Sequence, residues 1–402
     1  MHTRNTTDSL PATWLIVLIA GLPQLSETVY SPSLPDIAKA LKTSATMTEY
    51  TLTLYLMGFA LGTLFWGKCS DSWGRKPCMI AGLLVFILGC IGCYTAQSIP
   101  MLLMARFIQA FGGSIGSVLT QAMCRDVFHG PALGKIYSSV SSALSIFPAL
   151  GPLCGGLIAE HFGWRNIFIV LMMCAAILAL LIHTHLLETH PVAARKKASI
   201  GHVAKQMITD KKVVSFGLII ACCWGILFSY FSEGSFYLIT CLGLSPSYYG
   251  LSFIPIGIAA MLGGVVSKKM QNRHAGKWVM VYGLVITNVA LTLFAGVTMI
   301  HYFNPFLSVP IMIAAPIIFL TVCAFGITMV TSNALALALT DYKESIGTAS
   351  SLFGFFYYAG IALLTFFMGF LHNGTLLPMP LYFLALSDAM LIIGLKLLKQ
   401  KH

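Results

Sequence analysis

The stretch GKCSDSWGRKP, residues 67–77, separates two long apolar runs at 50–66 and 78–96. Each run approaches the length of about 20 residues that a helix needs to cross the hydrocarbon core of a bilayer. A short, charged, glycine-containing segment between two such helices indicates a tight turn at a membrane surface. The stretch therefore predicts an all-α membrane protein rather than a soluble domain.

The individual residues of this turn fit that position. Gly67 would let one helix end approach its neighbours closely, and Gly74 can adopt a positive φ where the chain reverses. Asp71 can pair with Arg75 or face a helix N-terminus, while Lys76 favours the cytoplasmic side of the membrane. The alternative interpretation is an ordinary charged turn that obeys the positive-inside rule.

The composition and the pattern of apolar runs extend this prediction to the whole chain. Of 402 residues, 57% are apolar and only 9% are charged, whereas a soluble domain has about 25% charged residues. Apolar runs of membrane length occur at 14–30, 47–67, 78–97, 100–122, 134–158, 167–187, 213–238, 248–267, 278–299, 306–335, 346–371 and 379–398. We therefore expect twelve transmembrane helices in two six-helix bundles, 1–187 and 213–402, joined by a basic cytoplasmic linker at 188–212.

The net charge of +11 has a topological explanation. With the N-terminus inside, most lysines and arginines fall on the inner side of the membrane, including Arg195, Lys196 and Lys197 of the linker. This bias predicts that both termini are cytoplasmic. It also removes the need for a nucleic-acid partner, although the linker could contact anionic lipid.

The sequence does not indicate covalent chemistry. The eleven cysteines lie in or beside apolar runs, where we expect them to fill helix interfaces rather than bind a metal or form disulfides. We find no nucleotide-binding loop and no nucleophile–base pair, and the histidines lie mostly near helix ends. We expect a secondary transporter without a cofactor; a polytopic membrane enzyme and a non-transporting receptor are the alternatives from other classes.

Two stretches resemble a known family. The pattern G-x-x-x-D-x-x-G-R-K at 67–76 resembles the loop between the second and third helices of the major facilitator superfamily. On the predicted fifth helix, the sequence 145–156 resembles the antiporter signature of drug exporters in that superfamily through Pro148, Gly151, Pro152, Gly155 and Gly156. The full signature has a further glycine where this chain has Phe147. A packing helix without directional meaning is the alternative.

The predicted fourth helix carries a charge inside an apolar span. Arg106 would be costly there unless it faced a partner or water, so its default interpretation is functional, and Gln109 shares its helix face. Together with the glycines that follow, this pattern resembles the fourth helix of drug–proton antiporters. The resemblance also implies that Asp126, at the end of this span, meets Arg75 and that Arg75 meets Asp71 in a cytoplasmic gate. Weak surface pairing is the alternative.

The first span contains a deeply placed acid. Glu27 lies about 13 residues into the span, or roughly 20 Å deep, where a carboxylate is either protonated or paired. The sequence Tyr-x-Pro-x-x-Pro at 30–35 resembles that of the Bcr/CflA-type exporters, but the family aspartate aligns with Thr28. One residue is about 100° of helix rotation, so Glu27 could point differently. The resemblance implies that Glu27, with Arg106 nearby, loads and releases the coupling proton.

Other polar and aromatic residues are candidates for a substrate cavity. Glu233 lies near the outer end of the seventh span, where it could either snorkel or contact substrate. Asp388 lies within the last span, and we expect it to be structural or cavity-facing. The other cavity candidates, each of which could instead serve helix packing, are Tyr30, Tyr55, Gln109, Tyr230, Phe356 and Tyr357.

The family resemblance implies proton-coupled efflux of small amphipathic or drug-like molecules by alternating access. The proton gradient would supply the energy, and the location would be the bacterial inner membrane, with both termini cytoplasmic. The expected partners are the small-molecule substrate, protons and the lipid bilayer, and the family expectation is a monomer. A proton-coupled importer, or a metabolite or siderophore transporter of the same fold, is the alternative, because these would differ only in cavity chemistry.

Overall fold

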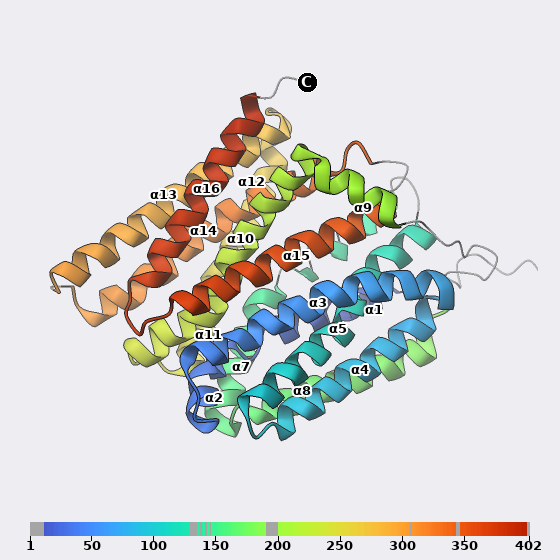
Figure 1. Cartoon of the computed structure of the whole chain (residues 1–402), viewed down its shortest axis with the longest axis horizontal. Coiled ribbons are helices and arrows are strands. Elements are labelled where there is room, and N and C mark those ends of the chain that lie inside the picture. The colour runs from blue at the N-terminus through green and yellow to red at the C-terminus, as the bar shows by residue number, and fades with distance from the viewer. Residues whose placement is uncertain are drawn as a thin grey trace, which may run out of the picture.

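The computed structural model describes residues 12–128, 135–136, 139–140, 143–144, 146–189, 200–305, 307–342 and 346–399. Throughout these residues the regular elements are helices (Figure 1). Ten of them are long and apolar enough to cross a membrane. The predicted all-α membrane fold is therefore confirmed.

The predicted first and fifth spans correspond to shorter helices. They are α1 (Thr13–Thr28) and α7 (Phe147–Phe162), each of 16 residues. After α1, a 3₁₀ turn at Ser31–Ser33 leads into α2 (Leu34–Ala40), with prolines in the first turn of both elements. Proline has no amide hydrogen to donate, so it is well tolerated in the first turn of a helix. Part of the predicted fifth span, before α7, lies outside the described residues.

The helices form two packed groups that follow the chain order. The first group contains α1, α2 and α7 together with α3 (Ala45–Trp73), α4 (Arg75–Thr95), α5 (Ile99–Val127) and α8 (Arg165–His185). The second group contains α10 (Lys211–Ser235), which continues as a π-helical turn at Phe236–Cys241, and α11 (Pro246–Leu251), α12 (Phe253–Met270), α13 (Gly276–Phe303), α14 (Val309–Ala338), α15 (Ile346–Leu371) and α16 (Pro378–Lys399). The predicted linker contains a short helix, α9 (Ile200–Thr209), which packs on α10 and α15. Its basic run at 195–197 lies outside the described residues.

The two groups meet along α3 and α15, which lie side by side in opposite directions (Figure 1). Near the start of α3, Tyr50 stacks on Phe366 with ring centroids 4.8 Å apart. Further along, Phe59 packs on Tyr358 with centroids 4.5 Å apart. Aromatic rings from both groups therefore line the seam between them.

A second contact between the groups brings helix backbones together. A Cβ atom added to Gly156 of α7 would overlap the carbonyl oxygen of Pro246, and one added to Gly250 of α11 would overlap that of Pro152. Small residues permit this close approach. We call the end of the bundle at which α3 begins, α15 ends and α7 meets α11 the closed end.

At the opposite end a cavity of about 700 Å³ lies between α3, α5 and α15. It is lined at its mouth by the exposed residues Lys68 and Ser72, and further in by Tyr357 and Tyr358. We call this the open end. The packing of the two groups thus differs between the two ends of the same seam.

Candidate transport site

Arg106 is the centre of a buried polar cluster in the first group. Its side chain is fully buried, and its Cζ atom lies 3.9 Å from the ring centroid of Tyr30 and 4.1 Å from that of Tyr55. Its Nη1 donates a hydrogen bond to Oε1 of Gln109, as the shared helix face predicts. Two aromatic faces and one amide oxygen therefore compensate part of the cost of burying this cation.

Glu27 of α1 lies close enough to Arg106 for electrostatic attraction. It is 4% exposed, and its Oε1 has no hydrogen-bond partner among the described residues. Tyr357 and Tyr358 of α15, which line the cavity, are also within electrostatic range of this carboxylate. A buried acid of the first group, with a cation beside it, is thus within electrostatic range of two tyrosines of the second.

The neighbouring position, Thr28, has a different environment. Its hydroxyl donates to the carbonyl of Gln24, and a Cβ on Gly151 would overlap that hydroxyl. Thr28 therefore faces α7, whereas Glu27 lies near Arg106. The displacement of the acid by one residue relative to the family sequence is thus compatible with contact to the arginine.

The two tyrosines around Arg106 are fixed by hydrogen bonds. The hydroxyl of Tyr30 lies 3.0 Å from Oγ1 of Thr51, and that of Tyr55 donates to the carbonyl of Pro23 at 3.4 Å. Both side chains are fully buried and are absent from the lining of the cavity. They support the arginine in this conformation, whereas the sequence suggested that they line the substrate cavity.

The other predicted cavity residues are dispersed. Tyr357 lines the cavity, together with Tyr358, which is not among the residues predicted from the sequence. Tyr230 packs against Tyr249 and Phe253 within the second group, with ring centroids 6.4 and 5.3 Å away. Phe356 is half-buried beside Phe355 and does not contribute to the cavity lining, and neither do Gln109 and Glu233.

The predicted contacts of Arg75 are present. Its Nε donates to Oδ2 of Asp126 at 2.9 Å, and its Nη1 donates to Oδ1 of Asp71 at 2.7 Å and to the hydroxyl of Ser70 at 2.8 Å. These residues belong to α3, α4 and α5 and line the cavity. Because all of them lie in the first group, these pairs do not join the two groups here, and the gate role stays a prediction.

The turn before α4 has the predicted backbone geometry and an additional cap. Gly74 has φ of 102°, a value that strongly favours glycine. The backbone N–H groups of Arg75 and Lys76 donate to the carboxylate of Glu188 at 2.8 and 3.2 Å. Lys76 also donates from Nζ to the carbonyl of His183 at 2.8 Å. The first backbone amides of α4 are thus satisfied by the segment that follows α8.

The glycines of α7 are packed more tightly against their neighbours than Gly67 is. A Cβ on Gly67 would make ordinary contact at 3.6 Å with a side chain of α5, so the predicted close approach is not required there. On α7, a Cβ on Gly155 would overlap the carbonyl oxygen of Val29, and Gly156 faces α11. Pro148 lies in the first turn of α7, and Pro152 lies inside it.

Phe147 stands where the exporter signature has a glycine. A Cβ on Gly21 of α1 would overlap the ring of Phe147, so the ring occupies the space that this glycine leaves open. The departure from the signature is therefore matched by a small residue on the helix opposite.

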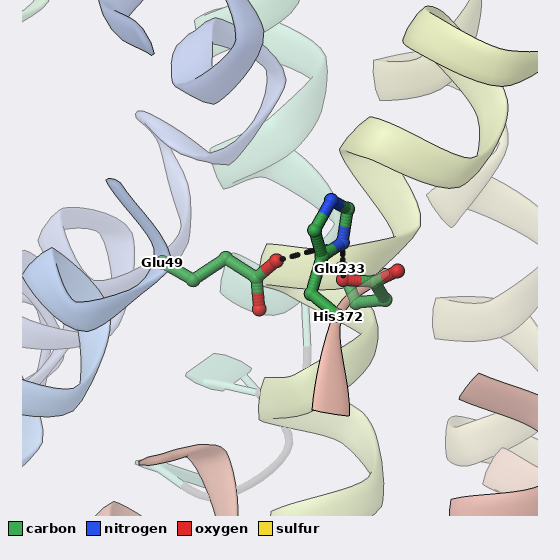
Figure 2. A group of neighbouring side chains, drawn as sticks. All are labelled: Glu49, Glu233 and His372. Atoms are coloured by element: carbon green, nitrogen blue, oxygen red, sulfur yellow. Dashed lines mark hydrogen bonds and ion pairs between the residues drawn. The ribbon is translucent and has the colours of Figure 1, made fainter. Parts of the chain in front are cut away.

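A second buried polar cluster lies at the closed end (Figure 2). Nδ1 of His372 lies 2.8 Å from Oε2 of Glu233 and 3.6 Å from Oε1 of Glu49. Glu49 comes from α3 of the first group, Glu233 from α10, and His372 directly follows α15. Of these three residues, only Glu233 is among the candidates predicted from the sequence. Glu49 falls inside the run predicted at 47–67, and an acid in an apolar run was the available signal.

Asp388 belongs to neither cluster. It is exposed on α16, where Nδ2 of Asn288 donates to its Oδ1 at 2.6 Å. It therefore faces away from the cavity and pairs with a neighbouring helix of its own group.

Comparison with known proteins supports the interpretation of the fold. Residues 16–365 match the family model described as the Major Facilitator Superfamily. An uncharacterized transporter of Rickettsia bellii (strain RML369-C) is 35% identical over 387 residues, which cover 94% of each chain. A bicyclomycin resistance protein homolog of Haemophilus influenzae (strain ATCC 51907 / DSM 11121 / KW20 / Rd) is 26% identical over 92% of each chain.

A solved structure of similar fold is the xylose transporter XylE from E. coli in a partially occluded inward-open conformation. It superposes with a TM-score of 0.73 at 13% identity and covers 96% of both chains. At this identity the likeness concerns the fold alone. The helical architecture, the family match and the transporter relatives agree that this protein is a multi-pass membrane transporter and not an enzyme: the chain belongs to the major facilitator superfamily.

Proposed function

We propose that this protein exports small amphipathic or drug-like molecules across the bacterial inner membrane in exchange for protons. The observation that carries the proposal is the Glu27 carboxylate, which is buried near Arg106 and within electrostatic range of two tyrosines of the cavity. The similarity to a bicyclomycin resistance protein homolog supports the choice of substrate class and the outward direction.

The coupling would follow from the environment of Glu27. A buried carboxylate is stable when it is protonated or when a cation lies nearby. Protonated, Glu27 is neutral, and Arg106 is then held by the tyrosine rings and Gln109 alone. Deprotonated, it attracts Arg106. A substrate that moves Tyr357 or Tyr358 would change the surroundings of Glu27, so substrate and proton would compete.

The distribution of lysine and arginine suggests which side each end faces. Lys68, Arg75 and Lys76 cluster at the open end, so the positive-inside rule assigns this end to the cytoplasm. In this orientation the cavity would receive substrate from the cell. Closing it would bring the second group toward Asp71 and Asp126, where we propose that the Arg75 contacts act as part of a cytoplasmic gate.

The test is proton release by the detergent-purified protein when bicyclomycin is added. We expect release from the wild type and from Asp388→Asn, which alters an exposed acid outside both clusters. We expect binding without release from Glu27→Gln. Release that persists in Glu27→Gln would exclude Glu27 as the coupling acid and would direct attention to Glu233 and Glu49. Binding without release in the wild type would contradict competition for one site.

A further inference from the structure

The cluster of Glu49, Glu233 and His372 lies on the boundary between the two groups of helices. We propose that these three side chains bind a divalent metal ion of the Zn²⁺ class at the closed end. The inference goes beyond the proposed function, because it does not depend on which solute is transported or on which acid carries the coupling proton. It rests on charge, on geometry and on the place of the cluster in the fold.

If both carboxylates of the cluster are ionised, they call for two positive charges. Glu49 is 1% exposed and Glu233 is 2% exposed, so water stabilises neither charge. A protonated His372 would balance only one of them. A divalent cation together with a neutral imidazole balances both carboxylates and leaves no net charge in the interior. A metal ion thus resolves the charge of all three side chains at once.

The geometry also fits a metal ion. One ligand atom from each side chain lies within 4.8 Å of the others. Zinc bonds to nitrogen and oxygen ligands of 2.0–2.2 Å place tetrahedral ligand atoms about 3.4 Å apart. The observed separations from Nδ1 of His372, 2.8 and 3.6 Å, lie on either side of that value. Small rotations of the carboxylates would complete three protein ligands and leave a fourth position for water.

Both carboxylate oxygens of Glu49 are available as metal ligands in this cluster. Neither of its carboxylate oxygens has a hydrogen-bond partner among the described residues, and Figure 2 shows the carboxylate pointing toward the imidazole of His372. A buried acceptor without a donor is costly, and a cation would remove this cost. Imidazole with carboxylate is a ligand set that suits Zn²⁺ and related borderline ions.

The surroundings position the imidazole and leave space at the acid. The ring of Phe236 meets His372 edge-on with centroids 5.5 Å apart. A Cβ on Gly369 would lie 3.4 Å from Oε2 of Glu49, so a glycine here keeps α15 close without crowding the carboxylate. Cys241 lies within electrostatic range of Glu233, but it is exposed and is not one of the three grouped ligands.

The location determines what the metal would do. Glu49 belongs to the first group, whereas Glu233 lies in the second and His372 directly follows its helix α15. An ion bound to all three would hold the closed end together, and opening that end would require its release. We therefore expect bound Zn²⁺ to stabilise the conformation described here and to slow alternation between the two states.

The experiment is a Zn²⁺ titration of the full-length, metal-free protein in detergent, followed by calorimetry and by thermal unfolding. We expect one Zn²⁺ per chain and a raised melting temperature for the wild type. Glu49→Gln and His372→Gln should each weaken binding at least about 100-fold, since loss of even an outer partner of a metal ligand costs 10- to 100-fold. Cys241→Ser and Asp388→Asn are the controls and should bind as the wild type does.

Three results would overturn the proposal. They are the absence of Zn²⁺ binding by the wild type, unchanged binding by both ligand variants, and loss of binding only in Cys241→Ser. Gel filtration and metal-free unfolding establish that each variant is folded, and Glu233→Gln replaces any variant that is not. If the wild type does not bind Zn²⁺ but low pH alone stabilises its closed end, the cluster binds protons instead.

Discussion

Among the described residues, two charged clusters lie at opposite ends of one seam, and they differ in how they join the helices. At the open end, Arg75 pairs with Asp71 and Asp126, all within the first group. At the closed end, Glu49 of the first group meets His372 of the second. The first arrangement can persist while the groups move. The second must break when they separate, so only the second depends directly on the conformational state.

The clusters also differ in their contact with water. The side chain of Asp71 is 48% exposed at the cavity, whereas that of Glu49 is 1% exposed. A partly solvated pair contributes modestly to stability. A dry, unbalanced cluster has a strong requirement for protons or a cation. The open end is thus built from pairs within one group, and the closed end from contacts between the two groups.

The largest effect is expected from a covalent bond across the closed end. The hydroxyls of Thr53 on α3 and Thr365 on α15 lie 3.3 Å apart, so Thr53→Cys/Thr365→Cys should form a disulfide under an oxidant. If this end opens in each cycle, as the proposed alternating access requires, we expect complete loss of transport in vesicles and recovery with a reductant. Each single variant is the control. Full transport with the disulfide formed would show that the closed end need not open.

The next prediction compares a glycine that packs within its own group with a glycine that packs against the other group. Gly155→Ala would force a methyl group into the Val29 carbonyl of the same group, at a cost on the order of 3 kcal/mol. Gly156→Ala would force one into Pro246 of the other group. We expect Gly155→Ala to lower the melting temperature clearly, and Gly156→Ala to favour opening of the closed end with a smaller change in stability.

The control for this pair is Gly296→Ala, where a Cβ has nothing within 4 Å. Melting curves measure stability, and maleimide labelling of Thr365→Cys measures opening, both with the exposed Cys154 and Cys241 replaced by serine. Equal melting temperatures and equal labelling for the Gly155→Ala and Gly156→Ala variants would contradict the distinction between the two contacts.

A smaller effect is expected at the open end. Asp126→Asn removes one charged partner of Arg75 but leaves Asp71 and Ser70 in place. Because the Asp126 side chain is 18% exposed, we expect a loss of about 1–2 kcal/mol in stability. Labelling of the closed end should not change, because the pair lies within one group. Increased labelling there would show that the two ends are coupled through Arg75.

The smallest effect concerns a charged pair of the second group. Nζ of Lys212 lies 2.7 Å from Oδ2 of Asp341, whose side chain is 64% exposed. Such surface pairs contribute little, so Asp341→Asn should change the free energy of unfolding by no more than about 0.5 kcal/mol. Chemical denaturation in detergent measures this. A loss of stability as large as that of Asp126→Asn would show that this exposed pair contributes as much as the Arg75–Asp126 pair does.

The sequence predicted what local patterns determine. The contacts of Arg75 with Asp71 and the positive φ of Gly74 follow from neighbours in one turn, and they are present. Gln109 meets Arg106 because three residues bring side chains to one helix face. These features need no knowledge of how distant helices pack.

What the sequence missed depends on distant helices. Glu49 lies near the start of one helix and His372 just beyond the end of another, where charged side chains usually meet solvent. Only the antiparallel packing of α3 and α15 brings them together. Likewise, Tyr230 resembled a cavity residue by its type, but the placement of α11 and α12 buries it among aromatic rings. Composition alone does not determine these neighbours.

The antiparallel pair of α3 and α15 has a mechanical consequence. α3 contains 29 residues and is therefore about 44 Å long, so a relative rotation of about 15° about its middle would displace each end by about 6 Å. That displacement exceeds the 2.8 and 3.6 Å separations around His372. A rotation of this size would therefore be enough to separate Glu49 from the two side chains of the second group.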